Sequence, residues 1–452
     1  MPLPAEHDAL VADRGDAPPM HPNSGIADCV GEARAAYAAR RPHSQALHAR
    51  ARAVMPGGNT RSVLSYGPFP TAMARGEGCR LWDVDGHEYL DLCGEYTAGL
   101  FGHSEPRIHA AVVQALGRGL NLSAVGEAEV ELAGILCRRF PSMELVRFTN
   151  SGTEANLMAL TAARAFTGRP AVLAFHGGYH GGVLTFPVSG ASAATAPFPF
   201  VMADYNDAPG VQALIRAHAG ELAAVIAEPM LGSGGCIPAQ PGFLGALRAA
   251  ASETGALLVL DEVMTSRMSA GGMQARTGIV PDLTTLGKYV AGGMSFGAFG
   301  GRADVMGQFA GTLPHAGTFN NNVLSMAAGR VAMGEVFTAD AAEALFRRGE
   351  VMRGALNGVC ARAGVPMCFT GLGSMATPHF RAGPVLRPHQ PSAHEDGLRE
   401  LFFFDMLADG IYLARRGMVA LSLPVAEADL ERFAAAVGEF VQSRGPLLRQ
   451  DA

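Results

Sequence analysis

One lysine in this chain stands in a setting that favours unusual chemistry. Lysine is scarce, because arginine supplies most of the positive charge, and Lys288 ends the apolar run Asp282-Leu-Thr-Thr-Leu-Gly-Lys288. Upstream, the buried-strand pattern Gly255-Ala-Leu-Leu-Val-Leu-Asp261 ends in a carboxylate. A desolvated lysine loses its proton more readily and forms a Schiff base with an aldehyde. Taken singly, each residue is more often a surface lysine or an ordinary strand-end aspartate.

A third segment has the features of an anion site. The run Asn150-Ser-Gly-Thr-Glu-Ala155 follows a strand-like stretch and opens a helix. Ser151 and Thr153 offer hydroxyl groups, and Gly152 allows the backbone to approach a ligand closely. A helix N-terminus adds free N–H groups and the positive end of the helix dipole. The common alternative for such a run is a Ser/Thr helix cap.

The lysine, the aspartate and the anion site together match the needs of pyridoxal phosphate (PLP). They supply an amine for its aldehyde, a carboxylate that keeps its ring nitrogen protonated, and a site for its phosphate. Two nucleotide-binding motifs are excluded. Gly287-Lys288 lacks the first glycine of a P-loop. Gly371-Leu-Gly373 lies late in the chain without a clear βαβ context, so we interpret it as a turn between strands.

Composition narrows the class of protein. The chain has 452 residues, 48% of them hydrophobic and 17% charged, which is typical of a compact globular enzyme. The net charge of −6 and the lack of a basic run argue against nucleic-acid binding. No apolar run is long enough to span a membrane, and the N-terminus lacks a secretory signal pattern. Seven scattered cysteines without a CxxC pair indicate reduced thiols, no metal site and a cytoplasmic location.

The order of predicted elements indicates an α/β fold with a mostly parallel sheet. We expect a flexible arm at 1–26, a helix at 27–54, and strands within 71–93 around the hairpin turn Asp85-Gly86. Helical stretches then alternate with apolar runs. The helices are predicted near 107–117, 127–139, 154–166, 208–219 and 242–254. The strands are predicted at Leu145–Thr149, Ala171–Phe175, Ala223–Glu228, Ala256–Asp261 and Phe296–Gly300.

This order predicts two domains. The large domain spans 93–330 and contains the sheet. A smaller α+β domain combines the N-terminal segment 27–92 with the C-terminal segment 331–452. The latter is expected to hold a long helix, short strands at Met367–Thr370 and Ala376–Phe380, and a terminal helix from Glu427.

Six motifs in order resemble the class III, fold-type I, PLP-dependent aminotransferases. The resemblance covers roughly residues 45–445 and implies that fold and PLP as cofactor. The motifs are Asn150-Ser-Gly-Thr-Glu-Ala155, Gly178-Tyr-His-Gly181, Glu228-Pro, Asp261-Glu-Val-Met-Thr, Thr285-Leu-Gly-Lys288 and Gly317-Thr-Phe-Asn.

The resemblance also assigns roles to individual residues. Lys288 would bind the cofactor aldehyde and then shuttle the substrate proton, and Asp261 would pair with the ring nitrogen. Tyr179 would stack on one face of the ring, with Glu228 nearby as a supporting acid. The remaining contacts would be Ser151, Gly152 and Thr153 on the phosphate, Val263 and Met264 on the other ring face, and Thr318 on the phosphate of the neighbouring subunit. A homodimer with shared sites follows from the role of Thr318. His180 is interpreted as a structural histidine.

The resemblance leaves two candidate reactions within this family. Thr284-Thr-Leu-Gly-Lys288 and Gly293–Arg302 are very similar to glutamate-1-semialdehyde aminomutase. Arg61-Ser-Val-Leu, Glu95-Tyr-Thr-Ala-Gly, Thr318-Phe-Asn-Asn-Asn and Arg416-Gly instead resemble the aromatic β-amino acid (β-phenylalanine) aminotransferases. The second resemblance is the lead, with 2-oxoglutarate or pyruvate as acceptor. It implies that Arg61 binds the donor carboxylate and Arg416 the acceptor carboxylate.

The sequence leaves two further alternatives. Arg415, next to Arg416, could take the acceptor role. A PLP-fold module that senses a ligand without catalysis is a candidate from another class. The intact set of Lys288, Asp261 and Ser151–Thr153 argues against such a module, as does the lack of a basic helix-turn-helix segment.

Overall fold

Seven strands form the central sheet of the computed structural model, which describes residues 25–189 and 192–450. The strand order is β4-β12-β11-β10-β7-β5-β6. β12 runs antiparallel to both of its neighbours, and the pairs between β11 and β6 are parallel. The bounds are β4 (Leu145–Thr149), β5 (Ala171–Phe175), β6 (Phe200–Ala203), β7 (Leu222–Ala227), β10 (Leu257–Asp261), β11 (Leu283–Gly287) and β12 (Gly297–Gly301). The expected α/β fold with a mostly parallel sheet is confirmed.

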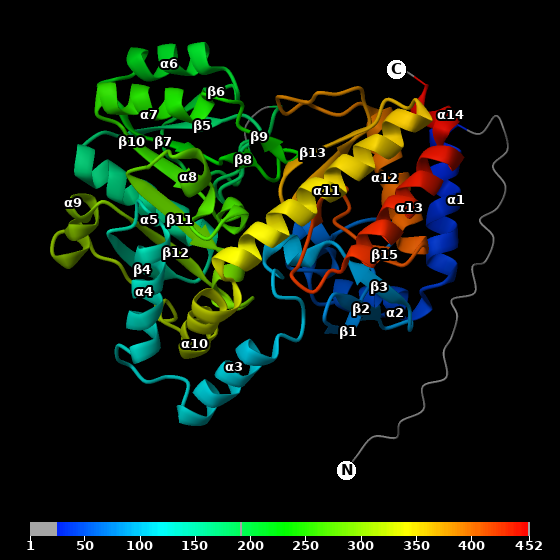
Figure 1. Cartoon of the computed structure of the whole chain (residues 1–452), viewed down its shortest axis with the longest axis horizontal. Helices are drawn as coiled ribbons and strands as arrows, with labels where there is room; N and C mark the ends of the chain where they lie inside the picture. Colours follow the sequence, from blue (N-terminus) through cyan, green and yellow to red (C-terminus); the bar gives the residue numbers. More distant parts are fainter. Residues whose placement is uncertain (1–24, 190–191, 451–452) are drawn as a thin grey trace.

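Both faces of this sheet are covered by helices, as buried parallel strands require. Successive side chains of a strand point to opposite faces, and β7 shows this alternation from residue 224 to residue 227. Leu222, Val225 and Ala227 join the apolar cluster under α6 (Ala208–Ala217) and α7 (Phe243–Thr254). Ala224 and Ile226 join the cluster under α5 (Gly152–Thr167). Figure 1 shows α5 on one side of the strands and α6 and α7 on the other.

Residues from the two ends of the chain share a second sheet. Its order is β1-β2-β3-β15, and β15 (Ile411–Tyr412) pairs in parallel with β3 (Glu88–Asp91). A three-stranded sheet, β13-β14-β16, lies nearby. The remaining strands are β1 (Met73–Glu77), β2 (Arg80–Asp83), β8 (Met230–Leu231), β9 (Ile237–Pro238), β13 (Cys368–Leu372), β14 (Met375–His379) and β16 (Val419–Ala420). This pairing supports the proposal that 27–92 and 331–452 make one small domain.

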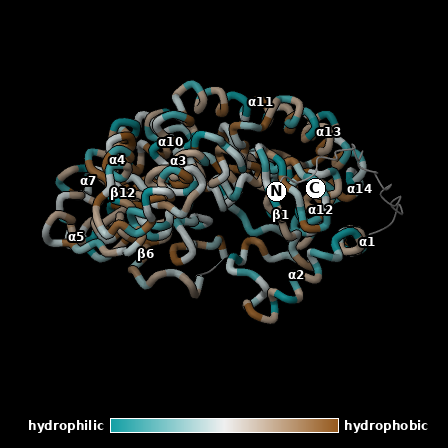
Figure 2. The backbone as a smooth tube through the Cα atoms, turned by 90° about the horizontal axis from the view of Figure 1, so that it is seen from below, coloured by the Kyte–Doolittle hydropathy of each residue, from teal (hydrophilic) through white to brown (hydrophobic). Residues whose placement is uncertain are grey.

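The helices around the second sheet give the molecule its length. α1 packs beside α12, and α11 packs on α13. Figure 2 shows α5 and α7 at one end of the molecule and α1 and α14 at the other. The remaining helices are α1 (Ile26–Ala39), α2 (Pro42–Arg52), α3 (Pro106–Arg118), α4 (Glu127–Arg139), α8 (Gly272–Thr277), α9 (Ala303–Met306), α10 (Val323–Val331), α11 (Ala339–Ala363), α12 (Ala393–Ala408), α13 (Glu427–Ser443) and α14 (Gly445–Leu448).

The structure corrects the single helix expected at 27–54. Two helices, α1 and α2, occupy this stretch because Pro42 starts a new helix. Proline lacks the N–H that a continuous helix needs, and it restricts the residue before it. The predicted arm at 1–26 lies almost wholly outside the described residues. The turn at Asp85-Gly86 joins β2 to β3 as expected.

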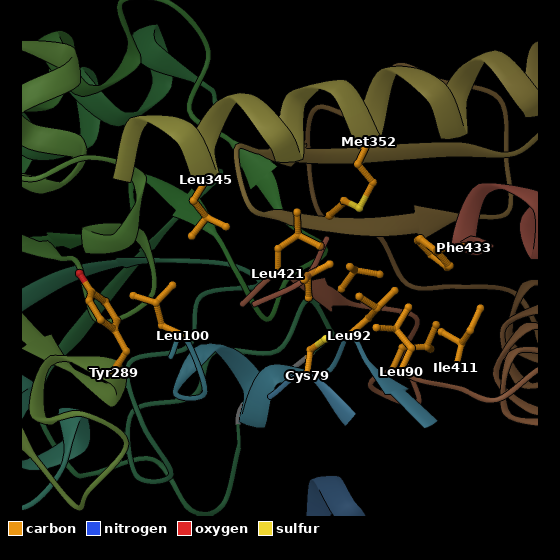
Figure 3. Packing of buried hydrophobic residues seen from close by; sticks show 14 of the residues in the cluster. Cys79, Leu90, Leu92, Leu100, Tyr289, Leu345, Met352, Ile411, Leu421 and Phe433 are labelled. Carbon is orange, nitrogen blue, oxygen red and sulfur yellow. The ribbon is translucent and has the colours of Figure 1, made fainter. Parts of the chain in front are cut away.

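A large apolar core joins the sheet to the terminal segments. It contains Tyr289 from the segment after β11, Leu345 and Met352 from α11, and Leu90 from β3. Figure 3 shows Leu345 and Met352 pointing down from α11 toward these strands. The backbone next to Lys288 is therefore anchored in packed core. Among the described residues, no helix is long and apolar enough to cross a membrane.

Candidate active site

The predicted site residues converge at one edge of the central sheet. Ser151 follows β4, Tyr179 follows β5 and Glu228 follows β7, while Asp261 ends β10 and Lys288 follows β11. These strands run in the same direction, so their carboxyl ends meet at the same edge. Ligand sites in open α/β sheets form at this edge.

Lys288 is the only lysine in the sequence. Its backbone has a φ of 53°, which lies in the left-handed region. This conformation is strained for any residue other than glycine. Burial lowers the pKa of its amine, and this effect outweighs the attraction of Asp261 and Glu228 for the charged form. The adjoining Tyr289 is buried against Phe101 and Phe337, which holds the strained turn in place. An amine with a lowered pKa on a fixed backbone is suited to react with an aldehyde.

Asp261 is buried and held by three donors. Asn156 Nδ2 donates to Oδ2 at 2.8 Å, and the backbone N–H of Val263 donates to Oδ1 at 2.9 Å. His180 Nδ1 lies 2.7 Å from Oδ2. Asn156 is fixed in turn, because Thr285 Oγ1 donates to its Oδ1 at 2.7 Å. These contacts fix the position and orientation of the Asp261 carboxylate in the site.

Glu228 is a second buried carboxyl group beside Asp261. Burial raises its pKa to about 7, while His180 and two backbone N–H groups counteract part of this rise. The donors are the amides of Tyr179 and Gly232, each 3.1 Å from a carboxyl oxygen. Glu228 therefore fixes the backbone that presents the Tyr179 ring, which is 40% exposed.

The start of α5 forms a cradle with little room for side chains. A Cβ at Gly152 would lie 2.9 Å from Val263, and one at Gly181 would lie 2.1 Å from Thr153 Oγ1. Thr153 Oγ1 also accepts from the backbone N–H of Gly182 at 3.3 Å. Ser151 Oγ caps the helix by accepting from the Glu154 amide at 3.2 Å. The N-terminus of α5 is thus open at Gly152 and Thr153 for an anion.

One cavity of about 120 Å³ brings most of these groups together. It is lined by Gly152, Thr153, Asn156, Tyr179, His180, Gly181, Glu228, Asp261, Val263, Met264 and Lys288. The residues fit PLP, because the amine, the buried carboxylate, an aromatic ring and an anion cradle all face the same space. An adjoining cavity of about 270 Å³ shares Tyr179 and reaches Arg416.

Arg61 and Arg416 both lie next to one aromatic ring, that of Tyr96. The guanidinium carbon of Arg61 is 5.2 Å from the ring centroid of Tyr96, and that of Arg416 is 5.6 Å from it. Both charges act to lower the pKa of Lys288. The structure therefore brings together two arginines from opposite ends of the chain near the reactive amine.

Arg415 and Arg416 point to different partners. Arg415 is exposed and donates to Glu400 at 3.4 Å. Arg416 donates from Nη2 to the Met418 sulfur at 3.2 Å, and its buried Nε has no hydrogen-bond partner among the residues that the structure describes. Arg416, with unused donors, is therefore the better candidate for a carboxylate ligand.

Thr318 does not join the cavity of its own chain. It is exposed and lies outside the set of residues that line the cavity. This position accords with the expected role in a neighbouring subunit's site.

Sequence reasoning missed several residues of the site. Asn156 and His180 contact Asp261 directly, and neither was assigned a role at the cofactor. The signal for Asn156 was available, since a buried polar residue one helical turn after Gly152 faces the same side of α5. Glu95 and Tyr96 lie in a segment that resembles the β-phenylalanine aminotransferases, but no local pattern indicates their contacts with Arg61, which join distant parts of the chain.

Comparison with known proteins agrees with this geometry. The profile of the class III aminotransferase family matches residues 63–399. A β-phenylalanine transaminase from Variovorax paradoxus is 52% identical over 429 residues, which covers 94% of this chain and 99% of the relative.

Solved structures show the same likeness. The crystal structure of a β-phenylalanine aminotransferase from Variovorax paradoxus, at 52% identity, matches with a TM-score of 0.92 over 94% of this chain and 99% of the other. A glutamate-1-semialdehyde aminomutase from Pseudomonas aeruginosa, at 22% identity, has a TM-score of 0.85 over 92% and 98%, which is a likeness of fold. The chain therefore belongs to the class III aminotransferases, enzymes that transfer amino groups with PLP as their cofactor.

Proposed function

We propose that this enzyme removes the amino group from an aromatic β-amino acid of the β-phenylalanine type and passes it to 2-oxoglutarate or pyruvate. The product of the first half-reaction is a β-keto acid. The observation that carries the proposal is the placement of Arg61 and Arg416 next to the same ring, that of Tyr96. The 52% identity to a β-phenylalanine transaminase supports the same substrate class.

Each arginine has a separate carboxylate to bind. In a β-amino acid the amine stands one carbon further from the carboxylate than in an α-amino acid. When the reacting carbon lies at Lys288, the two kinds of carboxylate therefore need different anchors. We assign Arg61 to the donor and Arg416 to the α-carboxylate of the acceptor, since a guanidinium group can bind either in a bidentate manner.

The residues of the chain divide the chemistry. PLP, when bound, supplies an aldehyde for the amino group and a ring that delocalises the electrons left on the substrate carbon. Lys288 Nζ would take the proton from that substrate carbon and pass it to the PLP carbon that bears the amino nitrogen. Asp261 holds a proton at the ring nitrogen, and Tyr179 with Val263 and Met264 confines the ring plane. Gly152 and Thr153 hold the phosphate at the start of α5, beside Ser151.

Two arginines favour transamination over the aminomutase alternative. An aminomutase keeps both amino groups on one substrate and needs no second acid to accept nitrogen. The division between Arg61 and Arg416 provides for two acids bound in turn. The likeness to the aminomutase structure at 22% identity concerns the fold.

We further propose that the enzyme is a homodimer in which Thr318 contacts the phosphate in the partner's site. Large apolar side chains are exposed next to Thr318 in the sequence and along α3, α4 and the loop between them. Monomeric proteins seldom expose large apolar patches. The exposed side chains include Val113, Leu116, Leu122, Val125, Val130 and Phe319. Asn321 ties the two stretches together by donating to Glu129 at 3.0 Å. A cytoplasmic location remains a proposal that rests on the spacing of the cysteines.

One assay tests the proposed reaction. The purified holoenzyme is mixed with β-phenylalanine and 2-oxoglutarate or pyruvate, and glutamate or alanine is measured. A parallel sample receives glutamate-1-semialdehyde without an acceptor. Amino-acid product in the first mixture supports the proposal. Isomerisation in the second, with no product in the first, would replace it with the aminomutase function.

A further inference from the structure

Arg61, the proposed anchor of the donor carboxylate, already holds a carboxylate of its own chain. Its Nη1 donates to Oε1 of Glu95 in a close ion pair. Both side chains are partly open to solvent, with 42% of Arg61 and 57% of Glu95 exposed. Glu95 uses one nitrogen of a group that has five N–H donors, so the contact is not a bidentate one.

The backbone of Glu95 is fixed, although its side chain is exposed. Gly94, Glu95, Tyr96 and Thr97 have φ values of 52°, 47°, 53° and 81°, a run of left-handed residues. Asp91 Oδ1 accepts from the amide of Gly94 at 2.9 Å, which secures the start of this turn. Residues in such conformations persist where the surroundings impose them, and they cluster at ligand sites. The turn presents the Glu95 carboxylate to Arg61 and the Tyr96 ring to both arginines.

We propose that Glu95 is a specificity-determining residue that occupies Arg61 until the carboxylate of a substrate displaces it. This inference rests on the proposed role of Arg61 in binding the donor. The substrate carboxylate replaces the Glu95 carboxylate on the same guanidinium group, and Glu95 turns into solvent. Its exposure makes this exchange inexpensive, because a released carboxylate is rehydrated at once.

The charges near the Lys288 amine explain why a carboxylate on Arg61 is useful before the substrate binds. Without Glu95, Arg61 and Arg416 would place two uncompensated positive charges around Tyr96, and both disfavour the protonated amine of Lys288. Before a substrate binds, the Glu95 carboxylate neutralises the positive charge of Arg61, so only the charge of Arg416 is uncompensated. An amine without a carboxylate cannot replace Glu95, so it leaves the ion pair intact and gains nothing from Arg61. Glu95 therefore sets how much a donor carboxylate contributes to binding.

Calorimetric titration of the holoenzyme with 3-phenylpropanoate tests the proposal. This acid keeps the ring and carboxylate of β-phenylalanine but lacks the amine, so it binds without reacting. Glu95→Gln should tighten its Kd about two- to fivefold, the range expected for removal of one exposed ion pair. In an Arg61→Ala background, Glu95→Gln should leave the Kd unchanged, because the guanidinium group for which Glu95 and the ligand carboxylate compete is absent. Glu77→Gln is the matched control, since Glu77 is an exposed partner of Arg75 in β1.

Each other result counts against a defined claim. Weaker or unchanged binding by Glu95→Gln would overturn the proposal, and weaker binding would make Glu95 an orienting partner of Arg61. A gain that persists in the Arg61→Ala background would also overturn it, since the effect would then be general repulsion. If Arg61→Ala alone binds 3-phenylpropanoate as tightly as the wild type, the donor role of Arg61 fails, and the proposal fails with it.

Discussion

His180 Nδ1 lies 2.7 Å from Oδ2 of Asp261, and both side chains are buried. Burial alone would lower the pKa of His180, but the hydrogen bond and charge of Asp261 raise it above its ordinary value. The hydrogen bond to Asp261 therefore stabilises the protonated form of the His180 ring. His180 serves to hold the Asp261 carboxylate in place, which is a structural role rather than that of a base.

Asp261→Asn should leave the fold intact and slow removal of the substrate proton by orders of magnitude. A neutral amide cannot hold a proton on the ring nitrogen as a carboxylate does. Single-turnover absorbance measures this step. Asp282→Asn is a suitable control, because Asp282 is also buried near the sheet but pairs with Arg248 and Arg302. Retained rates in Asp261→Asn would mean that another group protonates the ring.

Lys288→Ala should abolish turnover while PLP still binds non-covalently at the start of α5. The variant loses both the amine that binds the aldehyde and the proton shuttle. Borohydride reduction followed by mass spectrometry gives a clear readout, since Lys288 is the only lysine in the sequence. The wild type should gain the mass of the reduced cofactor at this residue, and the variant should not. Turnover near the wild-type rate would refute the assignment.

Thr318→Ala should weaken retention of PLP, and the loss should follow dissociation of the dimer. The hydroxyl is exposed in its own chain and is proposed to contact the partner's phosphate. PLP release is measured by gel filtration over a range of protein concentrations. A monomer with full activity would rule out the shared site.

Arg61→Ala and Arg416→Ala should damage different half-reactions. Loss of a bidentate charged contact costs on the order of 2–3 kcal/mol, or roughly 30- to 150-fold in kcat/KM. Arg61→Ala should impair deamination of the β-amino acid, and Arg416→Ala should impair reamination by the keto acid. Each half-reaction is followed by absorbance in a single turnover. Arg415→Ala is the control, because Arg415 pairs with Glu400 outside the cavity. Equal damage to both half-reactions in both variants would refute the division.

Glu228 should make the stability of the apoenzyme depend on pH between about 4.5 and 7. Its folded-state pKa, about 7, lies above the ordinary value of 4.5 because the carboxyl is buried. The folded state therefore binds this proton more tightly, so the stabilisation is complete below pH 4.5 and is lost as pH rises through 7. Unfolding free energies from urea titration should show the wild type losing about 2–3 kcal/mol relative to Glu228→Gln between pH 4.5 and 8. A constant difference would show that Glu228 stays ionised in the folded apoenzyme.

Local patterns predicted five of the seven strands of the central sheet and missed β6 and β11. Leu145–Thr149 and Ala171–Phe175 match β4 and β5 to the residue. β11 was not recognised as a strand, because Thr284 and Thr285 interrupt its apolar pattern. Both are buried, since Ser142 and Asn156 satisfy their hydroxyl groups. A hydrogen bond from a distant segment is invisible to local periodicity.

The same limit applied at the site. Apart from Thr318, the predicted cofactor residues follow strand ends in recognisable motifs, so the sequence was sufficient to bring them together. The left-handed turn at Glu95 and Tyr96 was not foreseen, because neither residue type favours positive φ. Such a conformation is imposed by packing between segments that are far apart in the chain.

The pairing of β3 with β15 has a consequence for how the protein is made. A ribosome adds roughly 5–20 residues per second, so β15 emerges on the order of tens of seconds after β3. During that interval the nascent N-terminal strands have no parallel partner, while the central sheet can already assemble. Chains released before Ile411 would expose the edge of β3 and invite aggregation. Folding of the small domain therefore depends on complete translation, even though Lys288 and Asp261 at the edge of the central sheet are synthesised before β15.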